Sequence, residues 1–479
     1  MAVAIDCPAM ECEDISMSSQ SRQQAAIPFL SSSHPKDTMD AGTKLTRSKL
    51  LASAGKGLGL MAILSPAVRA LFERIQTAGQ MVAHHSPVEA AKQEDYWSVI
   101  QQAFAVSRSN INLNSGWTSP SPKMVTEAFV RYKHQEDATA STMWQMLEPQ
   151  AETIRAGLAD LFGCDADEIA ITRNASESLQ ILLFGIDLRS GDEVIATSQD
   201  YPRMLTALRQ RELREGPKLK LVKIPFAPQN TDDIVAAIES AITPRTKLIL
   251  ISHIINITGQ IMPVRKICEM ARARGIETVV DGAHSFAQLD FKRDDLQCDY
   301  FGSSLHKWLY TPKGAGLLYV RKKKIPNVWA LMASEDKNKH DIRKFEEIGT
   351  HSSATRLSIG EALLFHGAIG AKRKEERLRY LSKYWMDRLK NLRGISFNTS
   401  FDPEQFCAIG NFSIDGGDPT KITEYLMSKH KIIATPIVHD EFTGIRITPN
   451  IFTTLRELDR FCGAIESMLT RGLPKALRL

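Results

Sequence analysis

The sequence has few of the features that mark metal-binding, secreted, membrane-spanning or nucleic-acid-binding proteins. Its seven cysteines are scattered, with no CxxC pair and no zinc-ligand spacing, so we expect free thiols in a reducing compartment and no metal site. No apolar run reaches the ~18–20 residues that cross a bilayer. The 60 basic and 55 acidic residues leave a net charge of +5 without a dense basic stripe. We therefore expect a soluble, cytoplasmic protein with no membrane span and no nucleic-acid partner.

The first part of the chain is predicted to be a leader. Residues 1–40 are rich in Ser, Gln and Pro and have no helical or strand periodicity. A basic segment, Lys44 to Lys56, and an apolar one, Gly57 to Val68, follow in the order of an export signal, although Arg47-Ser48 stands where a twin-arginine signal has two arginines. We assign residues 1–95 to a disordered leader. Export by a degenerate twin-arginine-like signal is the alternative to a cytoplasmic location, and a short hydrophobic helix is the alternative structural interpretation.

Beyond about Asp95, short apolar runs alternate with longer segments of helical period, which is typical of parallel strands joined by crossover helices. Strands are predicted at Glu168–Thr172, Glu193–Thr197, Lys218–Ile224, Lys247–Ser252, Glu277–Val280, Tyr300–Ser303 and Gly316–Val320. Helices are predicted at Ser176–Phe184, Thr231–Ala241 and Val264–Ala273. We predict an α/β domain, residues 96–358, built on one mixed or parallel sheet.

The pattern changes again from Ile359. The remainder predicts a long charged helix around Ala371–Leu392, strands at Ile409–Ile414, Lys431–Pro436 and Gly444–Thr448, and a closing helix from Thr454. This composition favours a second, smaller α+β domain, residues 359–479. We interpret the charge-rich run Lys372–Arg379 as a solvated helix face.

Reactive side chains follow several predicted strands at the point where each ends. These segments are Arg173-Asn174-Ala175-Ser176-Glu177, Asp281-Gly282-Ala283-His284 and Ser304-Leu305-His306-Lys307. Ligands of open α/β sheets bind outside the carboxyl ends of the strands, so these residues are expected to share one site. Either Asp281 or Lys307 alone would more often be a capping or surface residue. Their occurrence together is harder to explain unless both take part in a reaction.

The three segments supply what pyridoxal phosphate requires. Lys307 has apolar neighbours such as Trp308, and desolvation lowers the pKa of an amine, which leaves it free to condense with an aldehyde. The carboxylate of Asp281 can keep a pyridine nitrogen protonated. Asn174-Ala175-Ser176 opens a helix directly after a strand, where backbone N–H groups favour a phosphate, although Ser176 is equally plausible there as an ordinary N-cap.

These motifs resemble those of the class V aminotransferase family, fold-type I pyridoxal-phosphate enzymes, and within it isopenicillin N epimerase-like proteins. The resemblance runs from about Asn112 to the closing helix. It also rests on Thr172-Arg173-Asn174, on residues 252–260, and on Pro312-Lys313-Gly314, Gly316–Val320 and Gly349-Thr350. It implies the PLP-dependent transferase fold of type I. That fold has a large domain with a mixed, mostly parallel sheet and a smaller α+β C-terminal domain, and its cofactor is pyridoxal 5′-phosphate.

The resemblance also implies a role for each matching residue. Lys307 would carry the cofactor and move the substrate's α-proton, and Asp281 would hold the pyridinium nitrogen. Arg446 would grip the α-carboxylate of an amino-acid substrate, and Asn114 would border that substrate. Further cofactor-binding positions are Asn174, Ala175, Ser176, Tyr201, Asn256, His284, Ser304, His306 and Thr350. Thr350 would reach the cofactor of a neighbouring subunit, so a homodimer is implied.

Two departures separate this chain from the cysteine desulfurases of the family. Those enzymes usually stack a histidine on the cofactor ring, whereas the corresponding segment here offers Tyr201. They also carry a nucleophilic cysteine shortly before the carboxylate-binding arginine. Residues 434–444 contain no cysteine, and Cys407 precedes a predicted strand. A desulfurase that forms a persulfide is therefore disfavoured.

The predicted function is a PLP-dependent enzyme that acts at the α-carbon of an amino acid or a related small molecule. Loss of the α-proton can lead to epimerisation, to elimination of a β-substituent or to transamination. We favour epimerase-like chemistry, with a cysteine-independent carbon–sulfur lyase as the second candidate and an inactive PLP-fold scaffold as the non-enzyme alternative. Epimerisation needs an acid on each face of the substrate. Lys307 is one, and Tyr201, His284 or His351 is the other.

Overall fold

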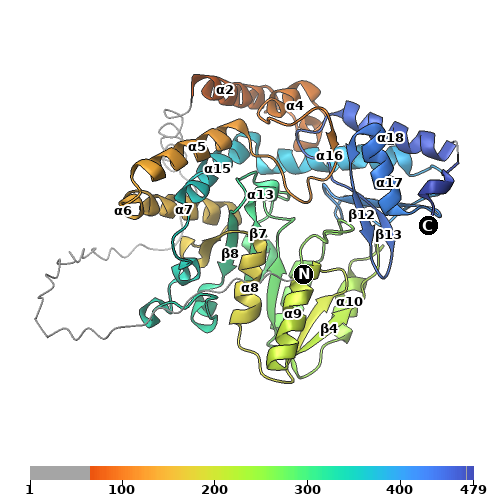
Figure 1. Cartoon of the computed structure of the whole chain (residues 1–479). Coiled ribbons are helices and arrows are strands. Elements are labelled where there is room, and N and C mark those ends of the chain that lie inside the picture. The colour runs from red at the N-terminus through yellow and green to blue at the C-terminus, as the bar shows by residue number, and fades with distance from the viewer. Residues whose placement is uncertain (1–64, 471) are drawn as a thin grey trace, which may run out of the picture. The chain divides into compact units, whose positions relative to one another are not determined.

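The computed structural model describes residues 65–470 and 472–479 (Figure 1). The predicted leader as far as residue 64, which includes most of the export-signal-like segment, lies outside the described residues. The described residues belong to one compact unit of the chain. No helix within 65–470 and 472–479 combines the length and apolar character that a membrane crossing requires.

A seven-stranded sheet forms the centre of the fold, in the order β2-β8-β7-β6-β5-β3-β4. Its strands are β2 (Ile169–Thr172), β3 (Glu193–Thr197), β4 (Lys218–Val222), β5 (Thr246–Ser252), β6 (Glu277–Asp281), β7 (Tyr300–Ser304) and β8 (Gly316–Val320). Strand β8 is antiparallel to both of its neighbours, and the other pairings are parallel. The predicted mixed, mostly parallel sheet is confirmed, and the ends of the strands differ from the predicted ones by at most two residues.

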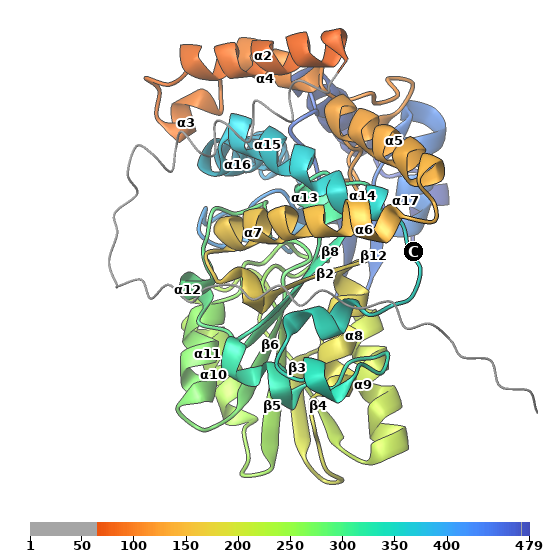
Figure 2. The ribbon, with the colours of Figure 1, turned by 90° about the vertical axis from the view of Figure 1, so that its left-hand side faces the viewer.

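Helices cover both faces of this sheet (Figure 2). Alternate residues of each strand point to opposite faces, so Leu248 and Leu250 pack with one set of helices while Ile249 and Ile251 pack with the other. The first set is α8 (Ala175–Gly185) and α9 (Pro202–Glu215); the second includes α7 (Ala151–Phe162), α10 (Asp232–Ser240) and α11 (Val264–Arg272). Burial on both faces explains why the strands are continuous apolar runs.

The described part of the chain begins with three helices: α2 (Pro66–Met81), α3 (Pro87–Ala90) and α4 (Glu94–Gln101). They correct the predicted boundary of the leader at residue 95. Phe72, Ile75 and Val82 are buried in the same core as the central sheet, because their spacing places them on one face of α2 and of the residue that caps it. The folded part of the chain therefore includes residues from Pro66 onward.

The C-terminal part contains a four-stranded antiparallel sheet of order β12-β13-β10-β9. Its strands are β9 (Ile395–Phe397), β10 (Gly410–Ile414), β12 (Thr435–Val438) and β13 (Thr443–Ile447), packed with α16 (Ala371–Leu389), α17 (Pro419–Tyr425) and α18 (Leu455–Thr470). The predicted strand Lys431–Pro436 is wrong as a single element. Its first half is β11 (Ile432–Ile433), which pairs in parallel with β1 (Ile111–Asn112), and its second half begins β12.

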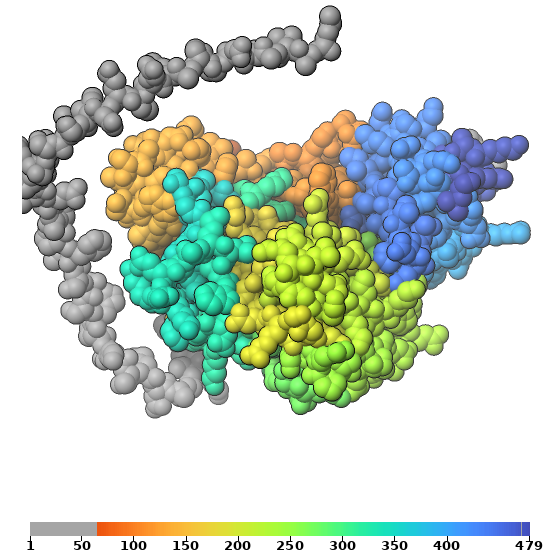
Figure 3. Space-filling view, turned by 60° about the horizontal axis from the view of Figure 1, so that its bottom comes forward, coloured from red at the N-terminus to blue at the C-terminus, as the bar shows by residue number. Residues whose placement is uncertain are grey.

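The pairing of β1 with β11 brings the N-terminal segment against the C-terminal part, and the two are adjacent in the space-filling view (Figure 3). Helix α16 lies between α3 and the central core, so the interpretation of Lys372–Arg379 as a solvated face is wrong in part. Lys374, Glu375 and Arg377 are buried. The remaining helices are α5 (Lys123–Ala138), α6 (Met143–Leu147), α12 (Arg293–Leu296), α13 (Leu305–Trp308), α14 (Ser353–Leu357) and α15 (Ile359–Ile369). The domain boundary at residue 358 stays a prediction.

Gly316 begins β8 at a point where the structure leaves no space for a side chain. A Cβ atom there would lie 2.6 Å from the backbone N and Cα of Asn174. Because these are backbone atoms, they cannot move aside as the tip of a side chain can. We expect Gly316→Ala to reduce the free energy of unfolding by about 1–3 kcal/mol, measured as a lower midpoint of thermal unfolding.

Gly367→Ala is the matched control. Gly367 lies inside α15, and a Cβ atom there meets nothing within 4 Å. Since alanine favours a helix over glycine, this change should stabilise the protein by about 0.5–1 kcal/mol. A Gly316→Ala protein as stable as the wild type would contradict the steric argument.

Candidate active site

The carboxyl ends of the parallel strands meet at one edge of the central sheet. The register pairs Ser252 with Asp281 and Asp281 with Gly302, so the ends of β5, β6 and β7 are level. A cavity of about 190 Å³ lies at this edge. Ten of the thirteen predicted site residues line it: Asn174, Ala175, Ser176, Tyr201, Asn256, Asp281, His284, Ser304, His306 and Lys307.

Lys307 reaches the cavity from α13, the short helix that follows β7. Its Nζ lies 3.0 Å from Nε2 of His284. Burial lowers the pKa of Lys307 from 10.5 to about 8; the Asp281 carboxylate partly opposes this shift and the Arg446 guanidinium adds to it. A substantial fraction of the amine is therefore neutral near pH 8, as a nucleophile or a base requires.

Asp281 is the last residue of β6, and its side chain is buried. Its Oδ1 accepts a hydrogen bond of 2.9 Å from the backbone N–H of Ala283. Burial raises the pKa of Asp281 to about 6, against the lowering effects of that N–H and of Lys307. A carboxylate that is desolvated in this way gains from a cation placed beside it, such as a protonated pyridine nitrogen.

The N-terminus of α8 is built as a seat for an anion. The Asn174 side chain caps the helix by accepting from the N–H of Glu177 at 2.9 Å, and the N–H of Ala175 donates to Oγ of Ser304 at 2.9 Å. Asn174 is thus the N-cap, and the alternative interpretation of Ser176 as the cap is wrong. These partners occupy the N–H groups of Ala175 and Glu177, so a phosphate would be bound by the N–H of Ser176 and by the positive end of the helix dipole.

Unpaired polar atoms around the cavity fit a polar ligand. Among the described residues, Nδ1 of His284, Nδ1 of His306 and Oδ1 of Asn256 are buried without a hydrogen-bond partner. Burial lowers the pKa of His306 to about 4, with Lys307 and Lys313 adding to the effect, and lowers the pKa of His284 well below its usual value. Both imidazoles are therefore neutral at pH 7. Together with the helix N-terminus and Asp281, this donor and acceptor set fits pyridoxal phosphate.

Arg446, on β13, is buried beside the cavity rather than in its wall. It donates from Nη1 to the carbonyl oxygen of Asn256 at 2.9 Å and from Nη2 to Oδ1 of Asn114 at 2.8 Å. Nη2 also lies 3.3 Å from Oγ1 of Thr435. Burial lowers the pKa of Arg446 to about 10. These acceptors are neutral, so the guanidinium is held in place while its charge remains available for a carboxylate.

Two candidates lie away from this cavity. Thr350 is exposed, and its predicted contact with a neighbouring subunit's cofactor stays a prediction. His351 has Nδ1 at 2.8 Å from the Gly349 carbonyl oxygen, and its ring lies 5.0 Å from that of Trp144. His351 does not line the cavity of its own chain.

Sequence reasoning missed several residues at the site. The cavity wall also includes Trp117, Leu179, Met204, Ser252, Ile254 and Ala283. Behind it, the buried carboxylate of Asp200 accepts hydrogen bonds of 2.7 Å from the N–H groups of Thr197 and Ser252, which ties the end of β3 to the end of β5. Asp200 stands beside Tyr201 in the sequence, but only the paired strands reveal what it joins.

The cysteines give no sign of a nucleophile. Of the five that the structure describes, four are buried, and none lines the cavity. Burial raises the pKa of Cys407 to about 12, which keeps it as a thiol. This agrees with the absence of a cysteine from residues 434–444.

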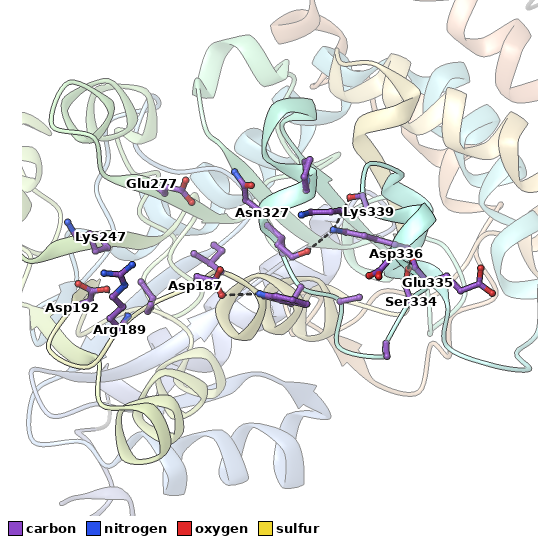
Figure 4. Close-up of a pocket in the computed structure, with 18 of the residues that line it drawn as sticks. Asp187, Arg189, Asp192, Lys247, Glu277, Asn327, Ser334, Glu335, Asp336 and Lys339 are labelled. Atoms are coloured by element: carbon purple, nitrogen blue, oxygen red, sulfur yellow. Dashed lines mark hydrogen bonds between the residues drawn. The ribbon is translucent and has the colours of Figure 1, made fainter.

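A larger cavity, of about 990 Å³, lies at the opposite edge of the sheet, where the parallel strands begin (Figure 4). It contains another buried lysine, Lys344, whose pKa burial lowers to about 8. Nζ of Lys344 donates to the carbonyl oxygens of Ile325 and Val328, each at 2.7 Å, and Asp187 accepts from Nε1 of Trp329 at 2.9 Å. Because these polar groups are satisfied by the protein itself, the smaller cavity is the better candidate for the active site.

Comparison with known proteins agrees with this geometry. The family model for aminotransferase class-V matches residues 111–435. Isopenicillin N epimerase from Streptomyces clavuligerus is 26% identical over 390 residues, which cover 78% of this chain and 98% of that protein.

Solved structures share the fold. The apo structure of a cysteine desulfurase from Thermococcus onnurineus NA1 has a TM-score of 0.68 at 20% identity and covers 79% of this chain and 98% of its own. A mutant of C-DES with glycine covalently linked to the PLP cofactor has a TM-score of 0.68 at 19% identity and covers 76% and 98%. The chain belongs to the aminotransferase class-V family and is a pyridoxal-phosphate-dependent enzyme with a type I fold.

Proposed function

We propose that this enzyme removes and returns the α-proton of an amino-acid substrate, as an epimerase of the isopenicillin N epimerase type. The observation that carries the proposal is the partly buried Lys307, whose Nζ lies 3.0 Å from Nε2 of His284 in a cavity that the buried carboxylate of Asp281 also lines. Bound pyridoxal phosphate supplies a ring that accepts electrons and so makes the α-proton acidic.

The residues that would hold the cofactor all line this cavity. The N-terminus of α8, with Ser304 and His306, would bind the phosphate. Asp281 would face the ring nitrogen, and its negative charge would keep that nitrogen protonated. Asn256 and His284, each with an unpaired buried atom, would face the remaining polar substituent of the ring.

Lys307 would act as the base on one face of the substrate. Nζ would accept the α-proton when neutral, and the lowered pKa of about 8 makes this form far more populated near neutral pH than in an exposed lysine. The neutral imidazole of His284 would hold Nζ in position through Nε2. Arg446, oriented by its hydrogen bond to Asn114, would bind the α-carboxylate and thereby direct the Cα–H bond toward Lys307.

Inversion also requires a proton on the opposite face of Cα. Lys307 enters the cavity after β7, whereas Tyr201 enters after β3, and β6 and β5 lie between these strands. His284 is occupied by Lys307, and His351 lies outside the cavity. We therefore favour the Tyr201 hydroxyl as the second acid. One proton leaves Cα and one returns on the other face, so substrate and product differ only in configuration.

We further propose a homodimer whose subunits share their active sites, and a cytoplasmic location. The exposed Thr350 supports the first, since it matches a family position that reaches a neighbouring subunit. Scattered cysteines, five of which are free in the described residues, support a reducing compartment.

The first test compares wild type with Lys307→Ala. We expect the purified wild type to show the visible absorption of a lysine-bound cofactor and the variant to lack it. In deuterated water, the wild type should incorporate deuterium at Cα of its substrate with loss of optical purity, and the variant should lose at least about 1,000-fold in rate. Lys344→Met removes a buried lysine of similar pKa outside this site and should retain both properties.

Other results would redirect the assignment. Release of sulfide or pyruvate by the wild type would identify a carbon–sulfur lyase. If wild type and Lys307→Ala were equally colourless after addition of pyridoxal phosphate, the protein would be an inactive scaffold.

A second test uses the pH dependence of cofactor addition to the cofactor-free protein. Only the neutral amine attacks the aldehyde, so the rate should rise with pH and level off above pH 8, the approximate pKa of Lys307. The Asp281 carboxylate raises the pKa of Lys307, so Asp281→Asn should move this midpoint to lower pH. A midpoint near pH 10.4, the value of an exposed lysine, would contradict burial of the amine.

The third test concerns the substrate carboxylate. Arg446→Lys keeps a positive charge but loses the planar fork that binds two oxygens. We expect kcat/KM to fall roughly 10- to 100-fold through KM, as expected for the loss of a charged hydrogen bond, while the cofactor absorption is unchanged. An unchanged KM would exclude Arg446 from substrate binding.

A further inference from the structure

A second lysine lies beneath the turn that carries Lys307. Lys374, on α16, is fully buried, and its Nζ donates to the carbonyl oxygen of Trp308, the residue after Lys307. The same Nζ lies 4.1 Å from the centroid of the Tyr310 ring and 3.4 Å from Nδ1 of His366. The family roles discussed above give Lys374 no function.

The turn needs partners from outside because it is short. Helix α13 has four residues, and the last carbonyl groups of a helix accept no hydrogen bond from N–H groups of the same helix. The N–H of Ser119 donates to the carbonyl oxygen of His306 at 3.1 Å, and Lys374 donates to that of Trp308. Different elements thus hold the carbonyl groups on either side of Lys307.

The backbone after the turn is strained. Tyr310 has φ of 64°, a left-handed conformation that bulky residues rarely adopt. Its ring lies against Lys374, and its hydroxyl donates to Oδ1 of Asn450 at 2.6 Å. Nδ2 of Asn450 donates to Oγ of Ser119 at 2.9 Å, which closes the network around the turn.

We propose that Lys374 is a positioning residue for Lys307, which it serves by fixing the Trp308 carbonyl and the Tyr310 ring so that the Lys307 side chain enters the cavity beside His284. This inference rests on the proposed role of Lys307. A misplacement of about 1 Å at a reacting group can cost roughly 100-fold in rate, so the hold on this turn has a catalytic consequence.

Packing alone does not account for a lysine at this position. An apolar side chain would fill the space without the cost of burying an amine. Burial lowers the pKa of Lys374 well below its usual value, and a neutral amine still donates to a carbonyl oxygen. The hydrogen bond to the Trp308 carbonyl oxygen therefore does not require a charge, and the side-chain amide of a glutamine can replace it in part.

Helix α16 offers a matched control. Arg377 is also fully buried, one turn further along the helix. It donates to the Ala91 carbonyl oxygen at 2.8 Å, pairs with Glu94 and lies over the ring of Trp97. Loss of Arg377 also removes a buried hydrogen-bonding side chain from α16, but its contacts are with the N-terminal helices instead of the Lys307 turn.

The test measures covalent attachment of pyridoxal phosphate to the cofactor-free protein. The attached cofactor is fixed by borohydride reduction at timed intervals, and peptide mass spectrometry quantifies it at Lys307. We expect Lys374→Met to slow attachment at Lys307 by roughly tenfold or more and Lys374→Gln by roughly threefold. In the holoenzymes, kcat should fall in the same order with KM little changed. Arg377→Met and Arg377→Gln should match the wild type in attachment, whatever their stability.

Other results would contradict either the role proposed for Lys374 or the proposed function. Attachment as fast in Lys374→Met as in wild type, or slowed equally by Arg377→Met, would leave Lys374 with a purely structural role. If Lys374→Met does not fold, Lys374→Gln decides, and equality with Arg377→Gln overturns the proposal. The proposed function itself fails if the wild type does not attach the cofactor at Lys307. It also fails if Lys307→Ala attaches the cofactor, at any other lysine, as fast as the wild type.

Discussion

The amine of Lys307 must be withdrawn from water and kept near a carboxylate that is itself buried, and the architecture around the sheet edge follows from this requirement. Burial of an isolated amine or carboxylate is unfavourable, as the shifted pKa values of Lys307 and Asp281 show. The parallel register places the two on adjacent strand ends without flexible connections. The stability of a sheet that is covered on both faces thus offsets the unfavourable free energy of burying the amine and the carboxylate.

Close backbone approach completes the same arrangement. The start of α8 reaches the site only because Gly316 has no side chain, and the N–H of Ala175 then meets Ser304 on β7. Asp200 joins the ends of β3 and β5 behind the cavity. The wall of the cavity is therefore fixed by hydrogen bonds between backbone N–H groups and the buried side chains of Ser304 and Asp200.

The central sheet and the polar residues at its strand ends could be predicted from the sequence, because apolar runs and the polar residues that end them are local patterns. It was insufficient where a residue's environment depends on distant segments. The charges of Lys374 and Arg377 suggested solvent exposure, yet both are buried, since α16 is covered by the N-terminal helices on one side and by the Lys307 turn on another. The division of Lys431–Pro436 between β11 and β12 likewise depends on β1, more than three hundred residues earlier in the chain.

The substrate side of the site is also assembled from distant segments. Arg446 is held by Asn114 from the N-terminal segment and by Asn256 from the turn after β5, so its guanidinium is fixed by segments that are far apart in the sequence. In the proposed mechanism Arg446 fixes the substrate carboxylate, and the fate of the α-carbon then depends on the group that faces it opposite Lys307. Residues 434–444 offer no thiol to attack a substrate sulfur, whereas Tyr201 borders the cavity from the β3 side. In the proposed mechanism this hydroxyl returns a proton to the α-carbon, and for that reason we favour inversion over cleavage.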